Sequence, residues 1–478
     1  ALDFREQAPA AATRDMYVAA GGAPAASSTE GWAAVGVPGT VAGLLHALEK
    51  WGTFDRGRVL APAIRLAEEG FLVTPRYQQA AERSLAKLRA DPEAARIFLV
   101  RDASGQWSVP PLGHRIRQPD LAHTLEAIAA RGRAGFYAGE VARAIASASA
   151  AGGGRLTAED LAAYVPVERV PVRGTFHGLT IESMPPPSSG GVVLIETLNI
   201  LSRFDLGRDG YRSPRAIHLI AEALRRSFAD RNTRLGDPAF VKNPVAQLLS
   251  PAYADRLRRT IDPLKASPSE AVRPYRAAWA ESDHTTHLSV VDPAGNAVAL
   301  TNTVNYSFGA GVVAPGTGVL MNNEMDDFAT RPGTTNLYGL LQGEANAIAP
   351  RKIPLSSMSP TFVYRDGKKG RQLFLVLGAP GGPTIITTVL HILLNVEVFD
   401  MNLAEAVAAP RFHHQWFPDA LWVEEGGFDE ATLAALRARG HEILPRPPWG
   451  NAQAILIDDD EVRWGVSDPR GEGLAAGF

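Results

Sequence analysis

The run from Thr285 to Asp292 constrains the fold of this chain more than any other feature. A strand with alternating side chains starts abruptly on two hydroxyl residues, Thr285 and Thr286, after the polar stretch 281–284. This junction makes sense if the chain is cut before Thr285, because the cut places a hydroxyl and a free α-amine on one residue. An α-amine has a reference pKa of roughly 7.7–8.0, which suits a general base. The alternative is that the two threonines simply begin a strand, since threonine is a good strand former.

The pattern of apolar residues changes at the same position. Before it, apolar residues recur at helical spacing over 40–150, and further elements are predicted as two strands within 166–183 and helices at about 192–203 and 213–231. After it, the pattern predicts strands at 285–292, 296–302, 361–365 and 372–377, an apolar helix at about 383–398, and strands beginning near 441, 452 and 462. This order suggests stacked sheets between helical layers.

Composition narrows the chemistry further. The 478 residues include no cysteine, which excludes disulfides, thiolate metal sites and a cysteine nucleophile. The net charge of −3 gives no indication of a nucleic-acid or anionic-membrane partner. No apolar run reaches the roughly 18 residues of a membrane span.

A glycine pair in the run 378–383 is a candidate oxyanion hole. Gly381 and Gly382 lie between a predicted strand and the apolar helix. Adjacent glycines let the backbone approach a ligand, and N–H groups at a helix start point outward. The alternative is an ordinary turn between strand and helix.

Two further clusters could bind the charged ends of a substrate. The acidic segment Asn322–Phe328 follows an apolar run and could hold an ammonium group. The serines of Pro354–Pro360, Ser356 and Ser357, could bind a carboxylate with Arg5 as the matching cation. The alternatives are a solvated loop, a capped turn and a surface arginine.

In order and spacing these motifs resemble the γ-glutamyltransferase (γ-glutamyltranspeptidase) family of N-terminal nucleophile hydrolases. The resemblance covers essentially the whole chain and is carried by segments 4–9, 184–191, 285–292, 322–328, 354–360, 380–382, 411–416 and 467–470. It implies an α+β fold, the αββα four-layer sandwich, in which two stacked and mainly antiparallel sheets lie between helical layers.

The resemblance also implies an activation step and a reaction. The precursor cuts itself between His284 and Thr285, giving a large subunit (1–284) and a small subunit (285–478) that form a heterodimer. Thr285 then attacks the γ-carbonyl of glutathione or another γ-glutamyl compound, and the acyl group passes to water, an amino acid or a peptide. No metal or organic cofactor is expected.

The resemblance assigns a role to each candidate residue. Thr303 supports Thr285, and the N–H groups of Gly381 and Gly382 hold the oxyanion. The substrate-binding residues are Arg5, Ser356 and Ser357 for the α-carboxylate, Asn305, Glu324 and Asp327 for the α-ammonium, and Tyr338 in a lid that only some members have.

The chain departs from the family pattern in three places. Glu324 stands where many bacterial members carry glutamine, which adds a negative charge beside Asp327. Ala379 replaces a serine of some relatives. Family members also have a long segment before the position of Arg5, so we expect an upstream segment, including any secretion signal of a periplasmic or secreted protein.

Three other functions compete with this one. A cephalosporin (glutaryl) acylase of the same family would bind a carboxylate without the α-ammonium, and the acidic residues argue against it. An uncleaved, silent binding protein on the same scaffold is a second alternative. A metallohydrolase using His284, His287, His413 and His414 is a third, although we expect the adjacent pair to pack inside the protein.

Overall fold

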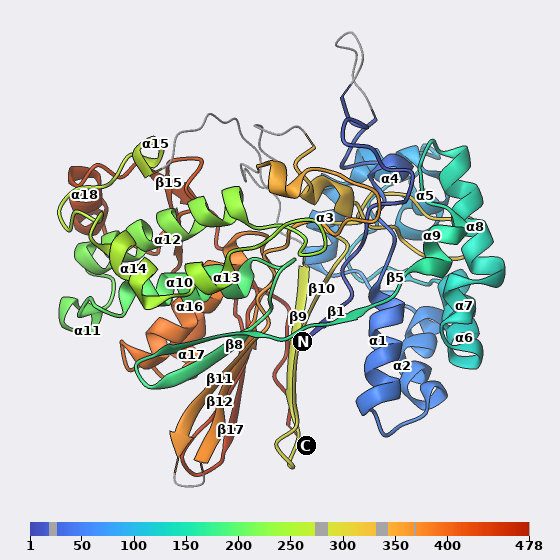
Figure 1. The fold of residues 1–478 in the computed structure, drawn as a ribbon. Helices are drawn as coiled ribbons and strands as arrows, with labels where there is room; N and C mark the ends of the chain where they lie inside the picture. The colour runs from blue at the N-terminus through green and yellow to red at the C-terminus, as the bar shows by residue number, and fades with distance from the viewer. Residues whose placement is uncertain (19–25, 273–284, 331–342, 368–369, 478) are drawn as a thin grey trace.

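The largest sheet in the described ranges has six antiparallel strands and lies toward the lower left of Figure 1. The computed structural model describes residues 1–18, 26–272, 285–330, 343–367 and 370–477. The strands follow the order β17 (Arg463–Ser467), β16 (Gln453–Ile457), β12 (Gly370–Gly378), β11 (Thr361–Gly367), β8 (Leu179–Ser183) and β7 (Val172–Phe176). Strands from before and after Thr285 therefore share one sheet, because β8 pairs with β11.

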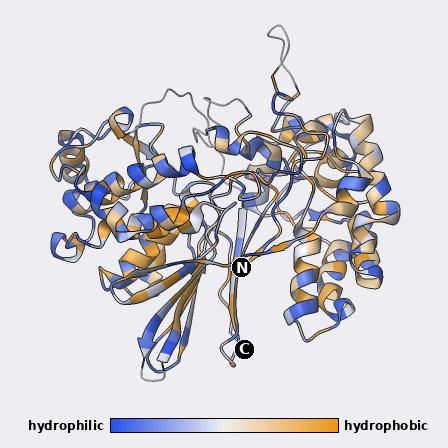
Figure 2. Ribbon diagram, in the orientation of Figure 1, coloured by the Kyte–Doolittle hydropathy of each residue, from blue (hydrophilic) through white to orange (hydrophobic). Residues whose placement is uncertain are grey.

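A layer of buried helices covers one face of this sheet. Helices α10 (Gly190–Leu201) and α16 (Thr384–Glu397) are buried on nearly all sides. Helix α10 packs between the sheet and α12 (Pro214–Arg234), and α16 lies against α10 and β12. Their apolar character is visible in Figure 2. The long helix α12 starts on Ser213, whose side chain accepts a hydrogen bond from Ala216 N, with Pro214 in the first turn.

The hairpin of β9 (Thr285–Val291) and β10 (Ala297–Thr303) packs against β12 and β16. Its tight turn is fixed by Asp292, whose Oδ1 accepts a hydrogen bond from Asn296 N at 2.8 Å, and by Gly295 at φ 86°. The turn sets the register of the hairpin. In that register Thr285 lies directly opposite Thr303.

The inward face of the hairpin is polar. His287 is buried and its Nδ1 lies 2.8 Å from Thr301 Oγ1, while Ser289 donates a hydrogen bond to Gln453 O at 3.0 Å. Burial lowers the pKa of His287 to about 3, so the ring is neutral. On the opposite face, Leu288 and Val290 are 43% and 50% exposed.

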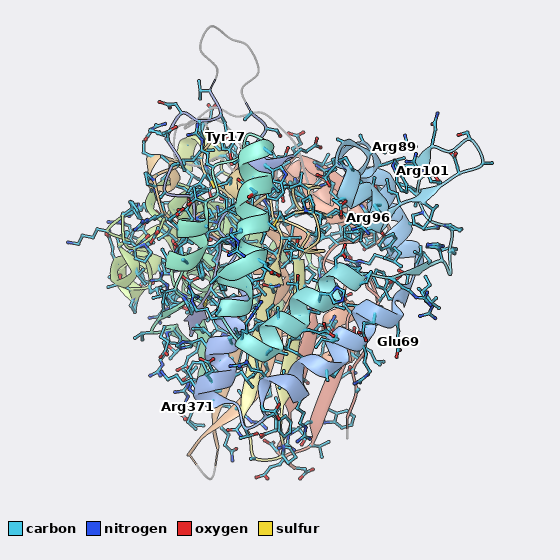
Figure 3. All side chains as sticks on the ribbon, turned by 90° about the vertical axis from the view of Figure 1, so that its right-hand side faces the viewer. Tyr17, Glu69, Arg89, Arg96, Arg101 and Arg371 are labelled. Carbon is cyan, nitrogen blue, oxygen red and sulfur yellow. The ribbon has the colours of Figure 1, made fainter. Side chains whose placement is uncertain are left out.

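A second helical body lies on the other side of the hairpin (Figure 1). Its helices are α1 (Thr40–Trp51), α2 (Arg56–Glu69), α3 (Pro75–Arg83), α4 (Leu85–Ala90), α5 (Pro92–Phe98), α6 (Pro119–Arg131), α7 (Ala134–Tyr137), α8 (Gly139–Ala151) and α9 (Ala158–Ala163). Figure 3 shows Arg89, Arg96 and Arg101 on its outer surface, where Arg96 pairs with Glu93 and Asp120.

Smaller elements complete the structure. The short strands are β1 (Leu2–Asp3) with β6 (Val167–Glu168), β2 (Phe71–Leu72) with β5 (Arg115–Ile116), β3 (Val100–Arg101) with β4 (Trp107–Ser108), and the sheet of β13 (Phe412–His413), β14 (Leu421–Glu424) and β15 (Ile443–Arg446). The remaining helices are α11 (Leu206–Asp209), α13 (Val245–Leu248), α14 (Pro251–Arg258), α15 (Ser269–Val272), α17 (Leu403–Ala408), α18 (Glu430–Ala438) and the 3-10 turns η2 (Trp32–Ala34), η3 (Glu324–Asp327) and η4 (Glu344–Asn346).

The predicted α+β class is confirmed, and each predicted strand and long helix is present within a few residues. The sequence pattern missed β13, β14, α17 and α18, because each is shorter than the windows that reveal periodicity. The pattern also did not reveal where the strand predicted near 441 belongs. This strand, β15, pairs in parallel with β14 and is not part of the six-stranded sheet. No helix in the described ranges has the length and apolar character needed to cross a bilayer.

Candidate active site

The predicted nucleophile lies at the open end of the hairpin. The hydroxyl of Thr285 donates a hydrogen bond to Thr303 Oγ1 at 3.2 Å, and Asn305 N donates to the same oxygen at 2.9 Å. Thr303 is nine-tenths buried, whereas Thr285 is partly exposed. Thr303 therefore orients the Thr285 hydroxyl, and the backbone N–H of Asn305 in turn holds the Thr303 hydroxyl.

One pocket collects the described site residues that the sequence predicted, with the sole exception of Gly381. Its lining includes Arg5, Thr285, Thr303, Asn305, Glu324, Asp327, Ser356, Ser357 and Gly382. These residues come from segments up to 377 positions apart, as the numbers of Arg5 and Gly382 show. His284 and Tyr338, which the sequence also placed in the site, lie outside the described residues.

The glycine pair follows the end of β12 and precedes α16. Gly381 has φ 132° and Gly382 has φ 52°, conformations that other residues adopt only with strain. Both carbonyl oxygens are occupied, since Gly381 O accepts from Thr384 N at 3.0 Å and Gly382 O from Ile385 N at 3.2 Å. Within the described residues, no acceptor takes a hydrogen bond from either glycine N–H. The pair is thus available to bind an oxyanion.

The charged residues form one compact cluster. Arg5 Nη1 lies 2.6 Å from Glu324 Oε1, Arg5 Nη2 pairs with Asp327 Oδ2, and Arg5 Nε donates to Pro354 O at 3.0 Å. The sequence analysis placed the cation and the carboxylates on opposite sides of a zwitterion. In the structure they are in direct contact, and each charge is compensated by an opposite one.

The cluster contains carboxylates with altered acidity. Burial raises the pKa of Asp327 to about 6, although the neighbouring Arg5 acts in the opposite direction. Burial likewise raises the pKa of Glu324 well above its ordinary value and that of Glu6 to about 7. The protonation of Asp327 and Glu6 therefore changes near neutral pH.

The serine segment lies across the pocket from these acids. Ser356 is held by its backbone, which donates to Pro187 O at 3.0 Å and accepts from Ser189 N at 2.8 Å. The Ser357 hydroxyl accepts a hydrogen bond from Arg231 Nη2 at 3.0 Å. The loop 184–191, noted in the sequence as part of the family resemblance, thus supports the predicted carboxylate site.

Asn305 connects the nucleophile to the acidic cluster. Its backbone has φ 74°, and its Nδ2 donates to Asn323 O at 3.0 Å, one residue before Glu324. The same residue therefore fixes both Thr303 and the start of η3.

The sequence analysis missed Arg231, which also lines the pocket. The side chain extends from the last turn of α12 and is 1% exposed. The sequence around it gives no signal of burial, because the adjacent positions are Asp230 and Asn232, as on a solvated helix face.

The three described histidines of the metallohydrolase alternative, His287, His413 and His414, form no metal site. His413 lies 3.0 Å from Thr387 Oγ1 and 2.9 Å from Gln415 Oε1, and His414 Nδ1 accepts from Trp416 N at 3.1 Å. The expected internal packing of the pair is confirmed. Over the described ranges, no group of three histidine or acidic residues is arranged to hold a metal ion.

The fold and these residues define an N-terminal nucleophile hydrolase. The model of the family described as gamma-glutamyltranspeptidase matches residues 1–478. The chain is 45% identical over 482 residues to the glutathione hydrolase proenzyme of Escherichia coli (strain K12), covering 100% of this chain and 81% of that protein. The chain belongs to the γ-glutamyltranspeptidase family, as its motifs indicated, and is an enzyme of that family.

Acylases of the same fold are also similar. The acylase ACY 1 proenzyme of Pseudomonas sp. (strain V22) is 38% identical over 482 residues, covering 99% of this chain and 81% of that protein. The crystal structure of cephalosporin acylase from Bacillus halodurans superposes with a TM-score of 0.83 at 27% identity, covering 100% of this chain and 84% of that one. The choice between the two activities therefore depends on the residues of the pocket.

Proposed function

We propose that this enzyme cleaves the γ-glutamyl amide bond of glutathione and related compounds. The observation that carries the proposal is the pocket itself, where a threonine hydroxyl lies among Arg5, two acidic residues and two serines. A γ-glutamyl group ends in a zwitterion, so it requires both a cation with hydroxyls and a pair of carboxylates. The glycine N–H groups match the charge that develops on its γ-carbonyl oxygen.

The proposed chemistry begins with cleavage between His284 and Thr285. The α-amine of Thr285 takes the proton of its own hydroxyl as Oγ bonds to the γ-carbonyl carbon. When the tetrahedral intermediate collapses, the C–N bond breaks and the leaving amine takes that proton. Water, an amino acid or a peptide then attacks the γ-glutamyl ester and releases Thr285. The Gly381 and Gly382 N–H groups stabilise the oxyanion in both halves.

The charges of a γ-glutamyl donor match those of the pocket. Arg5 is paired with Glu324 and Asp327. A bound donor would bring its ammonium to these acids and its carboxylate to Arg5 and the serines. Arg5, Glu324 and Asp327 would then each keep a partner of opposite charge, which offsets the cost of their burial.

We propose that the mature enzyme consists of a large subunit (1–284) and a small subunit (285–478), located in the periplasm or outside the cell. Strands β8 and β11, one from each piece, pair side by side, which would hold the two together after the cut. Fractionation of cells that produce the full-length protein tests the location.

The decisive experiment combines a denaturing gel with N-terminal sequencing. Two pieces are expected, the smaller beginning at Thr285, and a single uncut band from folded protein would support the silent binding protein instead. Thr285→Ala should leave the chain uncut and abolish hydrolysis of a γ-glutamyl anilide. Turnover retained by this variant excludes Thr285 as nucleophile.

The acylase similarity makes glutaryl transfer the second candidate. The two candidates differ in the α-ammonium, which Glu324 and Asp327 would bind only in a γ-glutamyl donor. Release of glutamate and of glutarate from matched anilides decides between them. Faster release of glutarate would favour the acylase.

A further inference from the structure

Arg231 is an exception among the buried arginines in the described part of the chain. The other four of these, Arg5, Arg225, Arg226 and Arg411, each lie within ion-pair distance of a carboxylate. Arg231 instead donates to three neutral oxygens: Ser189 Oγ at 2.7 Å, Asn232 Oδ1 at 2.7 Å and Ser357 Oγ at 3.0 Å. No described carboxylate lies within ion-pair distance of Arg231, and the charge of Asp327 acts on it only from further away.

A buried cation without an anion is costly unless a ligand supplies the opposite charge. Arg231 lines the pocket that holds Thr285, so such a ligand can reach it. Burial lowers the pKa of Arg231 to about 10, which still leaves it protonated at neutral pH. Arg5, by contrast, is paired with two acids, Glu324 and Asp327.

The hydrogen bond to Ser357 defines how this charge acts. Because Ser357 Oγ accepts from Arg231, the hydroxyl hydrogen of Ser357 is left to donate to another group. Ser357 lines the pocket, so a carboxylate there can accept that hydrogen. A hydroxyl that accepts from a guanidinium is also a stronger donor, because linked hydrogen bonds polarise one another.

We propose that Arg231 is a positioning residue for the α-carboxylate of the donor, fixing Ser357 as a hydrogen-bond donor and supplying the positive charge behind it. This inference rests on the proposed γ-glutamyl activity. It also gives the segment before Thr285 a direct part in the donor site, since Arg231 and Ser189 precede the proposed cut and Ser357 follows it.

The test measures coupling between Arg231 and the substrate carboxylate. Hydrolysis of a γ-glutamyl anilide is compared with hydrolysis of its α-carboxamide analogue, for wild type and Arg231→Gln. We expect the KM of Arg231→Gln for the carboxylate donor to rise about ten- to a hundredfold with kcat nearly unchanged. For the carboxamide, kcat/KM of the two proteins should agree within about threefold.

The control variant is Asn232→Ala, which removes a different neutral oxygen from Arg231 but leaves its charge and its bond to Ser357. It should keep most of the wild-type preference for the carboxylate donor. Equal losses on both donors in Arg231→Gln would overturn the inference and reduce Arg231 to a structural link between two loops. An Asn232→Ala variant with the same loss of preference as Arg231→Gln would also overturn it.

If Arg231→Gln is not cut into two pieces, Arg231→Lys decides in its place. Lysine keeps the charge but lacks the planar guanidinium that donates to Ser189 and Ser357 together. A reduced preference of Arg231→Lys for the carboxylate donor therefore supports the proposal. A preference equal to that of wild type contradicts it. A wild-type enzyme that hydrolyses neither donor would instead disprove the proposed function.

Discussion

Replacing Thr303 by valine tests the hydroxyl pair at the end of the hairpin. Valine has the same shape, so it leaves no cavity, but it removes the oxygen that accepts from Thr285 Oγ1 at 3.2 Å and from Asn305 N at 2.9 Å. The first bond, at about 0.5–1.5 kcal/mol, orients the nucleophile. The second leaves a buried N–H without its acceptor, which costs about 1–3 kcal/mol.

These two losses predict different observables. We expect the unfolding free energy of Thr303→Val to fall by about 1–3 kcal/mol. We expect kcat for a γ-glutamyl anilide to fall about ten- to a hundredfold. Two effects combine in this loss: the Thr285 hydroxyl is no longer oriented, and Asn305 shifts in the pocket. The assays are thermal or urea unfolding, anilide hydrolysis, and the extent of chain cleavage on a denaturing gel.

Thr301 provides a matched control on the same strand and the same face. It has the same 8% exposure as Thr303, and its hydroxyl lies 2.8 Å from His287 Nδ1. Thr301→Val should lose similar stability but keep kcat within about threefold of wild type. Thr303→Ser should restore most of the activity. Equal kcat values for the two valine variants, or a serine variant as slow as Thr303→Val, would refute the reasoning.

Three further predictions concern the charges, the glycine pair and the core. Because burial raises the pKa of Asp327 to about 6, its carboxylate becomes protonated as pH falls through that value and no longer pairs with an ammonium. The kcat/KM of a γ-glutamyl anilide should therefore decline below about pH 6, and Asp327→Asn should flatten this limb; an unchanged limb in the variant would assign it to another group. Gly382→Ala should lower kcat by up to ~10²-fold with a smaller change in KM, because alanine strains the backbone at φ 52° and displaces a donor of the oxyanion hole; a variant as fast as wild type would exclude this N–H from the reaction. Arg411→Ala should destabilise folding by about 3–5 kcal/mol in urea unfolding, since it removes one of the two described cations of the buried Asp468, 2.5 Å away, and also the donor to Trp449 O and Val407 O; a loss below about 1 kcal/mol would show that these contacts add little.

Local sequence was sufficient for the elements whose pattern is long. The alternation from Thr285 to Val291 and the tight turn after it predicted the hairpin, and the turn alone sets the register that opposes Thr303 to Thr285. The glycine pair was also readable locally, because positive φ angles at Gly381 and Gly382 require glycine.

The short elements were not predictable in this way. Strands β13 and β14 and helices α17 and α18 span between two and nine residues. Over such lengths the helical and strand periods cannot be told apart, and packing against the rest of the core decides the outcome.

The sequence by itself determined the family, the candidate nucleophile and the residue types that a γ-glutamyl donor requires, because these are properties of motifs along the chain. Only the tertiary structure decided how the charges pair. Arg5 contacts both acids, and Arg231 from α12 lies behind Ser357 without a carboxylate of its own. Burial and ion pairing depend on which segments, distant in sequence, meet in one pocket. A local sequence pattern does not contain this information.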